Sequence, residues 1–122
     1  MEEIPVRKRI GGILALLGEN FVIPNESKIN SYFHQLSTKE EYHEIFKGVN
    51  FLWKDKDKKT EIEKIIINLK VLELIKKSGV GYRISKSLAE YYKKNSKEIF
   101  KEKEGLIRKI SGELRDYLNR KE

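Results

Sequence analysis

The sequence predicts a mainly helical protein with one small β-hairpin and a long C-terminal helix. Three observations lead to this fold class. Apolar residues recur at the i, i+3, i+4, i+7 spacing of an amphipathic helix, as in Ile10, Ile13, Leu14 and Leu17. Two β-prone runs separated by a glycine turn occupy residues 74–85. From Ser87 onward the pattern is helical again, and the last stretch, 96–120, keeps its apolar residues roughly in line.

The composition favours a binding protein over an enzyme. The chain has 122 residues, a single-domain length, and 37% of them are charged, against roughly 25% in an average protein. It has no Cys, which excludes disulfides and Cys-ligated metals, and only two His. Glu40-x-x-His43 has the spacing of half a di-iron motif, but the sequence offers no second copy. We therefore expect no catalytic residues, no metal site and no cofactor.

The positive charge is concentrated in one part of the chain. Residues 1–50 carry 6 basic and 7 acidic side chains, residues 51–100 carry 13 and 7, and residues 101–122 carry 7 and 5. A surface that faces phosphates needs such a local excess. A general bias toward Lys and Ile would explain the number of lysines, but not why the first fifty residues lack the excess.

The sequence predicts no membrane span. The longest apolar run, Ile13–Leu17, is far shorter than the ~18 residues that a membrane helix needs. Arg7–Arg9 before it resembles the start of a signal peptide, but Glu2 and Glu3 and the lack of a small-residue cleavage site argue against secretion. The expected location is the cytoplasm, with no membrane partner.

Capping residues and apolar spacing predict the elements of the first half of the chain. They predict a helix over 6–17, an extended segment over 21–23, a helix over 26–36 and a third helix that ends at Gly48. A solvated charged loop follows over 54–59.

A capped helix and a hairpin follow the charged loop. Thr60 and Glu63 have the spacing of a capping box at the start of a helix. Its expected core residues are Ile62, Ile65, Ile66, Leu69 and Leu72. Leu74–Lys77 and Tyr82–Ser85 read as strands on either side of the turn Ser78–Gly81.

This order of elements resembles the winged-helix superfamily of DNA-binding domains. The residues that carry the resemblance are Thr60–Val71 as recognition helix, Leu74–Lys77 and Tyr82–Ser85 as wing strands, and Ser78–Gly81 as wing tip. It implies a winged-helix-like domain over residues 1–86, followed by a C-terminal helical extension over 87–122.

The pattern departs from a compact helix-turn-helix in one respect. About twenty residues lie between the second helix and the recognition helix, where a compact motif has a turn of ~3–4 residues. Either the helices at 38–47 and 61–72 form the pair, or the fold is an elaborated variant.

The resemblance and the charge pattern together predict the residues that contact DNA. With the isoleucines facing the core, Lys64, Asn68 and Val71 face outward, and Lys64 suits guanine as Asn68 suits adenine. Glu61 and Glu63 would repel phosphate, but in the first turn they cap the helix and suit its dipole. The alternative is a core hairpin with a solvated lysine face. The predicted DNA-binding residues are Lys58, Lys59, Lys64, Asn68, Lys76, Lys77 and Arg83.

The expected function is therefore double-stranded DNA binding, sequence-specific or general, by a small transcriptional regulator. The alternative is a non-enzymatic protein-interaction module, a winged-helix subunit of a larger assembly that does not bind DNA. A large exposed apolar strip would favour this alternative. The sequence names no small-molecule effector.

The apolar pattern of the last expected helix predicts a homodimer. It is expected over 96–120, about 37 Å long, after a capping box of Asn95 and Glu98. Its apolar stripe is too wide to leave in water, and a second copy would cover it. In the competing interpretation the helix folds back on the 6–17 helix, with Gly105 and Gly112 marking a bend. The predicted dimer interface consists of Ile99, Leu106, Ile107, Ile110, Leu114, Tyr117 and Leu118.

Overall fold

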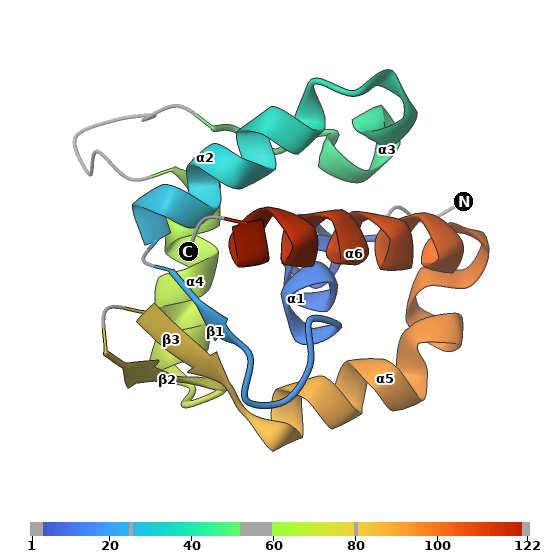
Figure 1. Ribbon diagram of the computed structural model, residues 1–122. Helices are drawn as coiled ribbons and strands as arrows, with labels where there is room; N and C mark the ends of the chain where they lie inside the picture. The colour runs from blue at the N-terminus through green and yellow to red at the C-terminus, as the bar shows by residue number, and fades with distance from the viewer. Residues whose placement is uncertain (1–3, 25, 52–59, 80, 121–122) are drawn as a thin grey trace.

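The computed structural model describes residues 4–24, 26–51, 60–79 and 81–120, and it confirms the predicted fold class (Figure 1). The described part is mainly helical, with a small antiparallel sheet and a long C-terminal helix. The elements in chain order are α1 (Val6–Ala15), β1 (Val22–Ile23), α2 (Glu26–Ser37), the 3₁₀ turn η1 (Glu40–Tyr42), α3 (His43–Phe46), α4 (Glu61–Val71), β2 (Ile75–Ser78), β3 (Gly81–Ile84), α5 (Lys86–Phe100), the 3₁₀ turn η2 (Lys101–Lys103) and α6 (Glu104–Arg120).

The predicted hairpin is present, and the extended segment before α2 joins it as a third strand. Within the described residues the sheet has the order β1-β3-β2, with both pairs antiparallel. Gly81 is required where β1 crosses β3, because a Cβ at this position would lie 2.0 Å from the carbonyl oxygen of Ile23. The sequence placed Gly81 at the wing tip, but its backbone is instead packed against β1.

The helices cover one another around α1. In Figure 1, α6 runs between α2 and α5, and α1 lies behind it. The contacts agree with this view, since α1 packs against α4, α5 and α6, and α2 packs against α4 and α6. The recognition-helix candidate α4 is therefore held by α1, by α2 and, on the sheet side, by β2.

The C-terminal half is two helices, not the predicted helix over 96–120. α5 continues through Asn95, and the chain turns at Lys101, which has a positive φ of 50°. The buried Ser96 hydroxyl donates to Glu104 Oε2 at 2.5 Å, and Arg108 Nη2 donates to Ser96 Oγ at 3.0 Å. This network joins the end of α5 to the start of α6, and it lowers the pKa of Glu104, first through the Ser96 hydrogen bond.

Much of the predicted dimer interface is covered within one chain, which corrects the prediction for its three central residues. Three of its residues, Ile107, Ile110 and Leu114, are fully buried, and α6 contacts α1 and α2. Ser111 Oγ also donates to the carbonyl oxygen of Ile13 at 2.9 Å. The other four residues are partly buried against the same core; they are Ile99, Leu106, Tyr117 and Leu118. The helix therefore folds back on α1, as in the competing interpretation, but the chain turns at Lys101 and α6 continues through Gly105 and Gly112.

The predicted division at residue 86 is not visible in the packing. Buried residues from both sides of that boundary, such as Ile13, Phe33, Phe100 and Leu114, belong to one hydrophobic cluster. The two parts share a core and form one structural unit. None of the helices in the described ranges is long and apolar enough to cross a membrane.

Two core predictions for α4 differ from the structure. Leu72 is 58% exposed, because α4 ends at Val71 and the chain turns at Glu73, whose φ is 60°. Ile65 is only half-buried, although Ile62 and Ile66 are fully buried as expected.

Candidate functional site

The start of α4 confirms the capping box. Thr60 Oγ1 accepts a hydrogen bond from the backbone N–H of Glu63 at 3.2 Å, and Glu63 Oε1 accepts one from the backbone N–H of Thr60 at 3.0 Å. Glu61 Oε1 accepts from the backbone N–H of Asn50, also at 3.0 Å. Both acidic side chains of the first turn are thus bound to the backbone, at the end of the helix where the dipole favours negative charge.

The outward face of α4 carries the side chains that the sequence predicted. Lys64 and Asn68 are exposed, and Val71 is 72% exposed, whereas the opposite face buries Ile62 and Ile66 completely. From position 64 to position 71 the helix rises by about 10 Å. The face therefore presents a cation, an amide and an apolar side chain in a row.

The hairpin places two predicted cations opposite each other. Lys76 pairs with Arg83 across β2 and β3, and partners in register project from the same face of a sheet. Both are exposed, and Arg83 Nη2 donates to Ser78 Oγ at 3.4 Å. Val22 of β1 pairs with Arg83 from the other side and is also exposed. Lys77 is one residue on, so it projects from the other face.

One basic residue of this region, Lys70, was not singled out from the sequence. Its ammonium group lies 5.6 Å from the ring centroid of Tyr82, which is the register partner of Lys77. The Tyr82 hydroxyl donates to Glu26 Oε1 at 2.6 Å. This hydrogen bond, together with burial, raises the pKa of Tyr82 to about 12. The cluster joins α2, α4 and the hairpin, and no local pattern reveals it because its members are distant in the sequence.

The remaining predicted contacts, Lys58 and Lys59, lie outside the described residues. Among the described residues, no salt bridge involves Lys76, Lys77 or Arg83. On α6 and η2, by contrast, several cations form ion pairs with glutamates.

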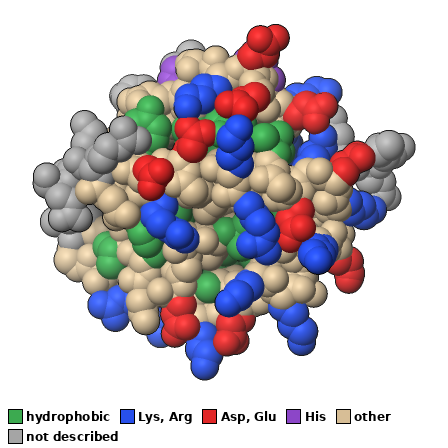
Figure 2. All heavy atoms as spheres, turned by 45° about the vertical axis from the view of Figure 1, so that its right-hand side comes forward, with side chains coloured by type: hydrophobic (Ala, Val, Ile, Leu, Met, Phe, Trp, Pro, Cys, Tyr) green, Lys and Arg blue, Asp and Glu red, His purple; other side chains and the backbone are tan. Residues whose placement is uncertain are grey.

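The face turned forward in Figure 2 shows Lys and Arg interspersed with Asp and Glu and no broad patch of one sign. Some of the charged side chains of the protein are joined in ion pairs. Lys39 lies 2.6 Å from Glu113, and Lys109 lies 2.9 Å from Glu41. These pairs join the region of η1 to α6. Each pair neutralises one positive and one negative side chain, so these four residues add no net charge to the surface.

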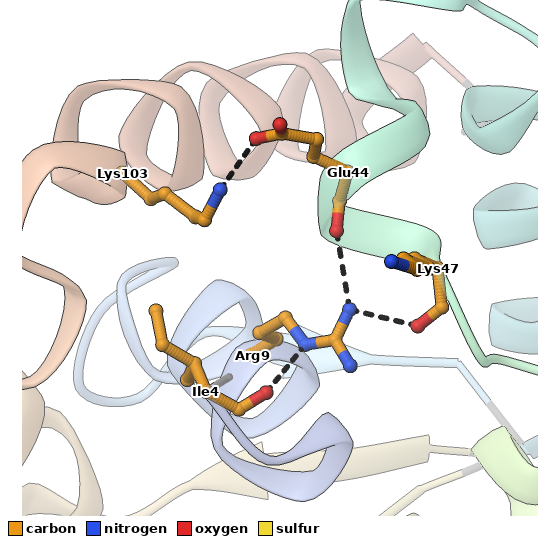
Figure 3. Close-up of a pocket in the computed structure, with 5 residues that line it drawn as sticks. All are labelled: Ile4, Arg9, Glu44, Lys47 and Lys103. Carbon is orange, nitrogen blue, oxygen red and sulfur yellow. Dashed lines mark hydrogen bonds and ion pairs between the residues drawn. The ribbon is translucent and has the colours of Figure 1, made fainter. Parts of the chain in front are cut away.

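A cavity of about 190 Å³ beside α3 contains a buried arginine (Figure 3). Arg9 is only 6% exposed, and its Nη1 donates to the carbonyl oxygens of Ile45 and Lys47, both at 2.8 Å. Its Nε donates to the carbonyl oxygen of Ile4 at 2.9 Å. The last carbonyl groups of a helix lack hydrogen-bond donors within the helix. At the end of α3, the Arg9 guanidinium is that donor.

The residues that line the cavity therefore connect α1, α3 and η2. Lys103 forms an ion pair with Glu44 across its mouth, which lowers the pKa of Glu44. The sequence interpretation took Arg9 only as part of a basic run. Its position four residues before the buried Ile13 was the available signal that it lies on the inner face of α1.

The described residues gather no group of side chains that could hold a metal ion. Glu40 and His43 are both exposed. The chain matches no family model, no curated protein and no solved structure. The outward face of α4 and the β2–β3 hairpin remain as the candidate functional surface.

Proposed function

We propose that the chain is a double-stranded DNA-binding protein of the winged-helix type, acting as a small transcriptional regulator. In this proposal α4 lies in the major groove and the β2–β3 hairpin contacts the phosphate backbone. The observation that carries it is the exposed row of Lys64, Asn68 and Val71 on α4, next to a hairpin that presents Lys76 and Arg83.

The order and packing of the elements support the proposal. A helix, a short strand, further helices, a capped helix and a hairpin follow one another, and α4 packs against both α2 and β2. α4 is thus fixed to the bundle on one side and to the hairpin on the other. A reading helix needs such rigid support, because base contacts depend on its exact register in the groove.

The charges of this region support it further. Lys64, Lys70, Lys76, Lys77 and Arg83 are all exposed on α4 or on the hairpin. The two acidic residues of the first turn of α4 are engaged with backbone amides. Each phosphate that such a cation neutralises releases counterions, and binding then weakens steeply with salt.

The hairpin is tested by removing its three cations together. In the variant Lys76→Ala, Lys77→Ala, Arg83→Ala, the slope of log K against log salt on a random duplex should shrink by about two to three units, since each lost contact contributes ~0.9. Fluorescence anisotropy at several salt concentrations measures this slope. Circular dichroism verifies that the variant is folded.

A charge-matched control comes from α5, where Lys93, Lys94 and Lys97 are exposed. Replacing these three by Ala removes the same net charge, but we expect the slope to change by less than about one unit. An unchanged slope in the folded hairpin variant, or equal changes in both variants, would remove the hairpin from the proposed interface.

The interaction-module alternative has less support. It requires a large exposed apolar strip, whereas the exposed large hydrophobic side chains among the described residues are Val22, Val71, Leu72 and Tyr91. Only Val71 and Leu72 are adjacent in sequence. Failure of the wild-type chain to bind any duplex, even at low salt, would favour this alternative.

A further inference from the structure

Val71 is the most exposed large hydrophobic side chain of the described residues, and its position on α4 is informative. It is 72% exposed at the C-terminal end of the helix. A single exposed apolar residue is ordinary on a protein surface. Val71, however, shares the outward face of α4 with Lys64 and Asn68 and follows the exposed Lys70 directly. An apolar contact is thus offered within a basic surface.

The spacing of Asn68 and Val71 suits neighbouring base pairs. Residues three apart lie side by side on one face of a helix, here separated by about 4.5 Å along its axis. Successive base pairs are stacked ~3.4 Å apart. In the major groove, Asn matches the hydrogen-bonding edge of adenine, and an apolar side chain matches the C5-methyl group of thymine.

We infer that Val71 contacts a thymine methyl group next to the adenine that Asn68 binds, so that the α4 face selects thymine-containing B-form DNA. This inference rests on the proposed function. The exposed lysines on either side favour a polyanionic partner, and Val71 offers that partner an apolar contact. Thymine in a DNA major groove supplies both.

The C5-methyl group and the groove shape both distinguish DNA from RNA. Uracil lacks the C5-methyl group, and the major groove of an A-form RNA helix is too narrow for a helix to read. A protein partner would need to bury Val71 among cations that it must also neutralise.

The experiment compares duplexes that differ only in the methyl group. The probes are a labelled alternating adenine–thymine DNA duplex, the same duplex with deoxyuridine in place of thymidine, and an alternating adenine–uracil RNA duplex. Removing one buried methyl group should weaken binding of the wild-type chain to the deoxyuridine duplex about fourfold, and the RNA should bind more weakly still. Anisotropy at low salt measures all three.

The variant Val71→Ala should bind the thymine and deoxyuridine duplexes equally, because its side chain no longer reaches the methyl group. Alanine is favoured in helices and position 71 is exposed, so the variant should fold. Val22→Ala is the matched control: it shortens another exposed valine, on β1, and should keep the fourfold preference.

The outcomes separate this inference from the proposed function. Equal binding of the thymine and deoxyuridine duplexes by the wild-type chain overturns the inference but leaves DNA binding intact. A preference that survives in Val71→Ala assigns the methyl contact to another residue and also overturns it. Failure to bind any duplex overturns the proposed function, and the inference with it.

Discussion

Replacing Gly12 of α1 by alanine should destabilise the protein through one contact. A Cβ at Gly12 would lie 2.2 Å from Cζ and 2.9 Å from Cε2 of Phe100, the last residue of α5. Phe100 is fully buried, so its ring cannot swing into solvent. Overpacking a core in this way costs ~1–3 kcal/mol or more, and the gain in helix propensity offsets up to ~1 kcal/mol. We expect a net loss of about 2 kcal/mol.

Gly112 of α6 provides the opposite case for the same substitution. It is exposed, and nothing lies within 4 Å of a Cβ placed there. Gly112→Ala should therefore stabilise the protein by ~0.5–1 kcal/mol, through helix propensity alone.

Thermal unfolding followed by circular dichroism measures both effects. For a chain of this length, 1 kcal/mol corresponds to about 4 °C in Tm, from ~2.1 cal/mol/K per residue. Gly12→Ala should lower Tm by about 8 °C, and Gly112→Ala should raise it by about 3 °C. An increase in Tm for both variants would mean that the end of α5 does not pack on α1, and it would refute the single-core arrangement.

Three further predictions concern separate parts of the molecule. Arg9→Met should cost about 3 kcal/mol in urea unfolding, because several carbonyl oxygens near α3 lose a charged donor at ~1.5 kcal/mol or more each; a loss below ~1 kcal/mol would contradict this role. Folding holds the pKa of Tyr82 at about 12, above its ordinary value, so the Tyr82 contribution to stability is complete below pH ~10 and is lost as the pH rises toward 12. Tyr82→Phe should flatten that part of the stability–pH curve, and an unchanged curve would count against the Glu26 hydrogen bond. Asn68→Ala should cost ~1–3 kcal/mol on a selected DNA site and much less on random duplex, and equal losses on both would show that α4 does not read bases.

Local signals were sufficient for much of the fold. The capping box of Thr60 and Glu63, the amphipathic spacing of α1 and α2, and the glycine turn of the hairpin each depend on residues a few positions apart. For the same reason the outward face of α4 could be predicted, since helical periodicity alone places Asn68 and Val71 opposite the isoleucines.

Contacts between distant parts of the chain could not be derived in this way. Lys70, Tyr82 and Glu26 meet only because α2, α4 and the hairpin pack together. Arg9 finds its carbonyl partners 36 and 38 residues further along. The spacing of Arg9 and Ile13 indicates at most that Arg9 faces inward, and the partners in both clusters became visible only in the tertiary structure.

The C-terminal helix shows where the sequence alone reaches its limit. Its stripe of Ile107, Ile110 and Leu114 determined that one face must be buried, and the structure buries it completely. The hydrophobic effect has no direction, however, and a stripe can be covered equally by a second copy or by another part of the same chain. The turn at Lys101 decided between them, because it breaks the predicted single helix and returns α6 onto α1 and α2. The sequence thus determined which residues avoid water, and the tertiary structure decided what covers them.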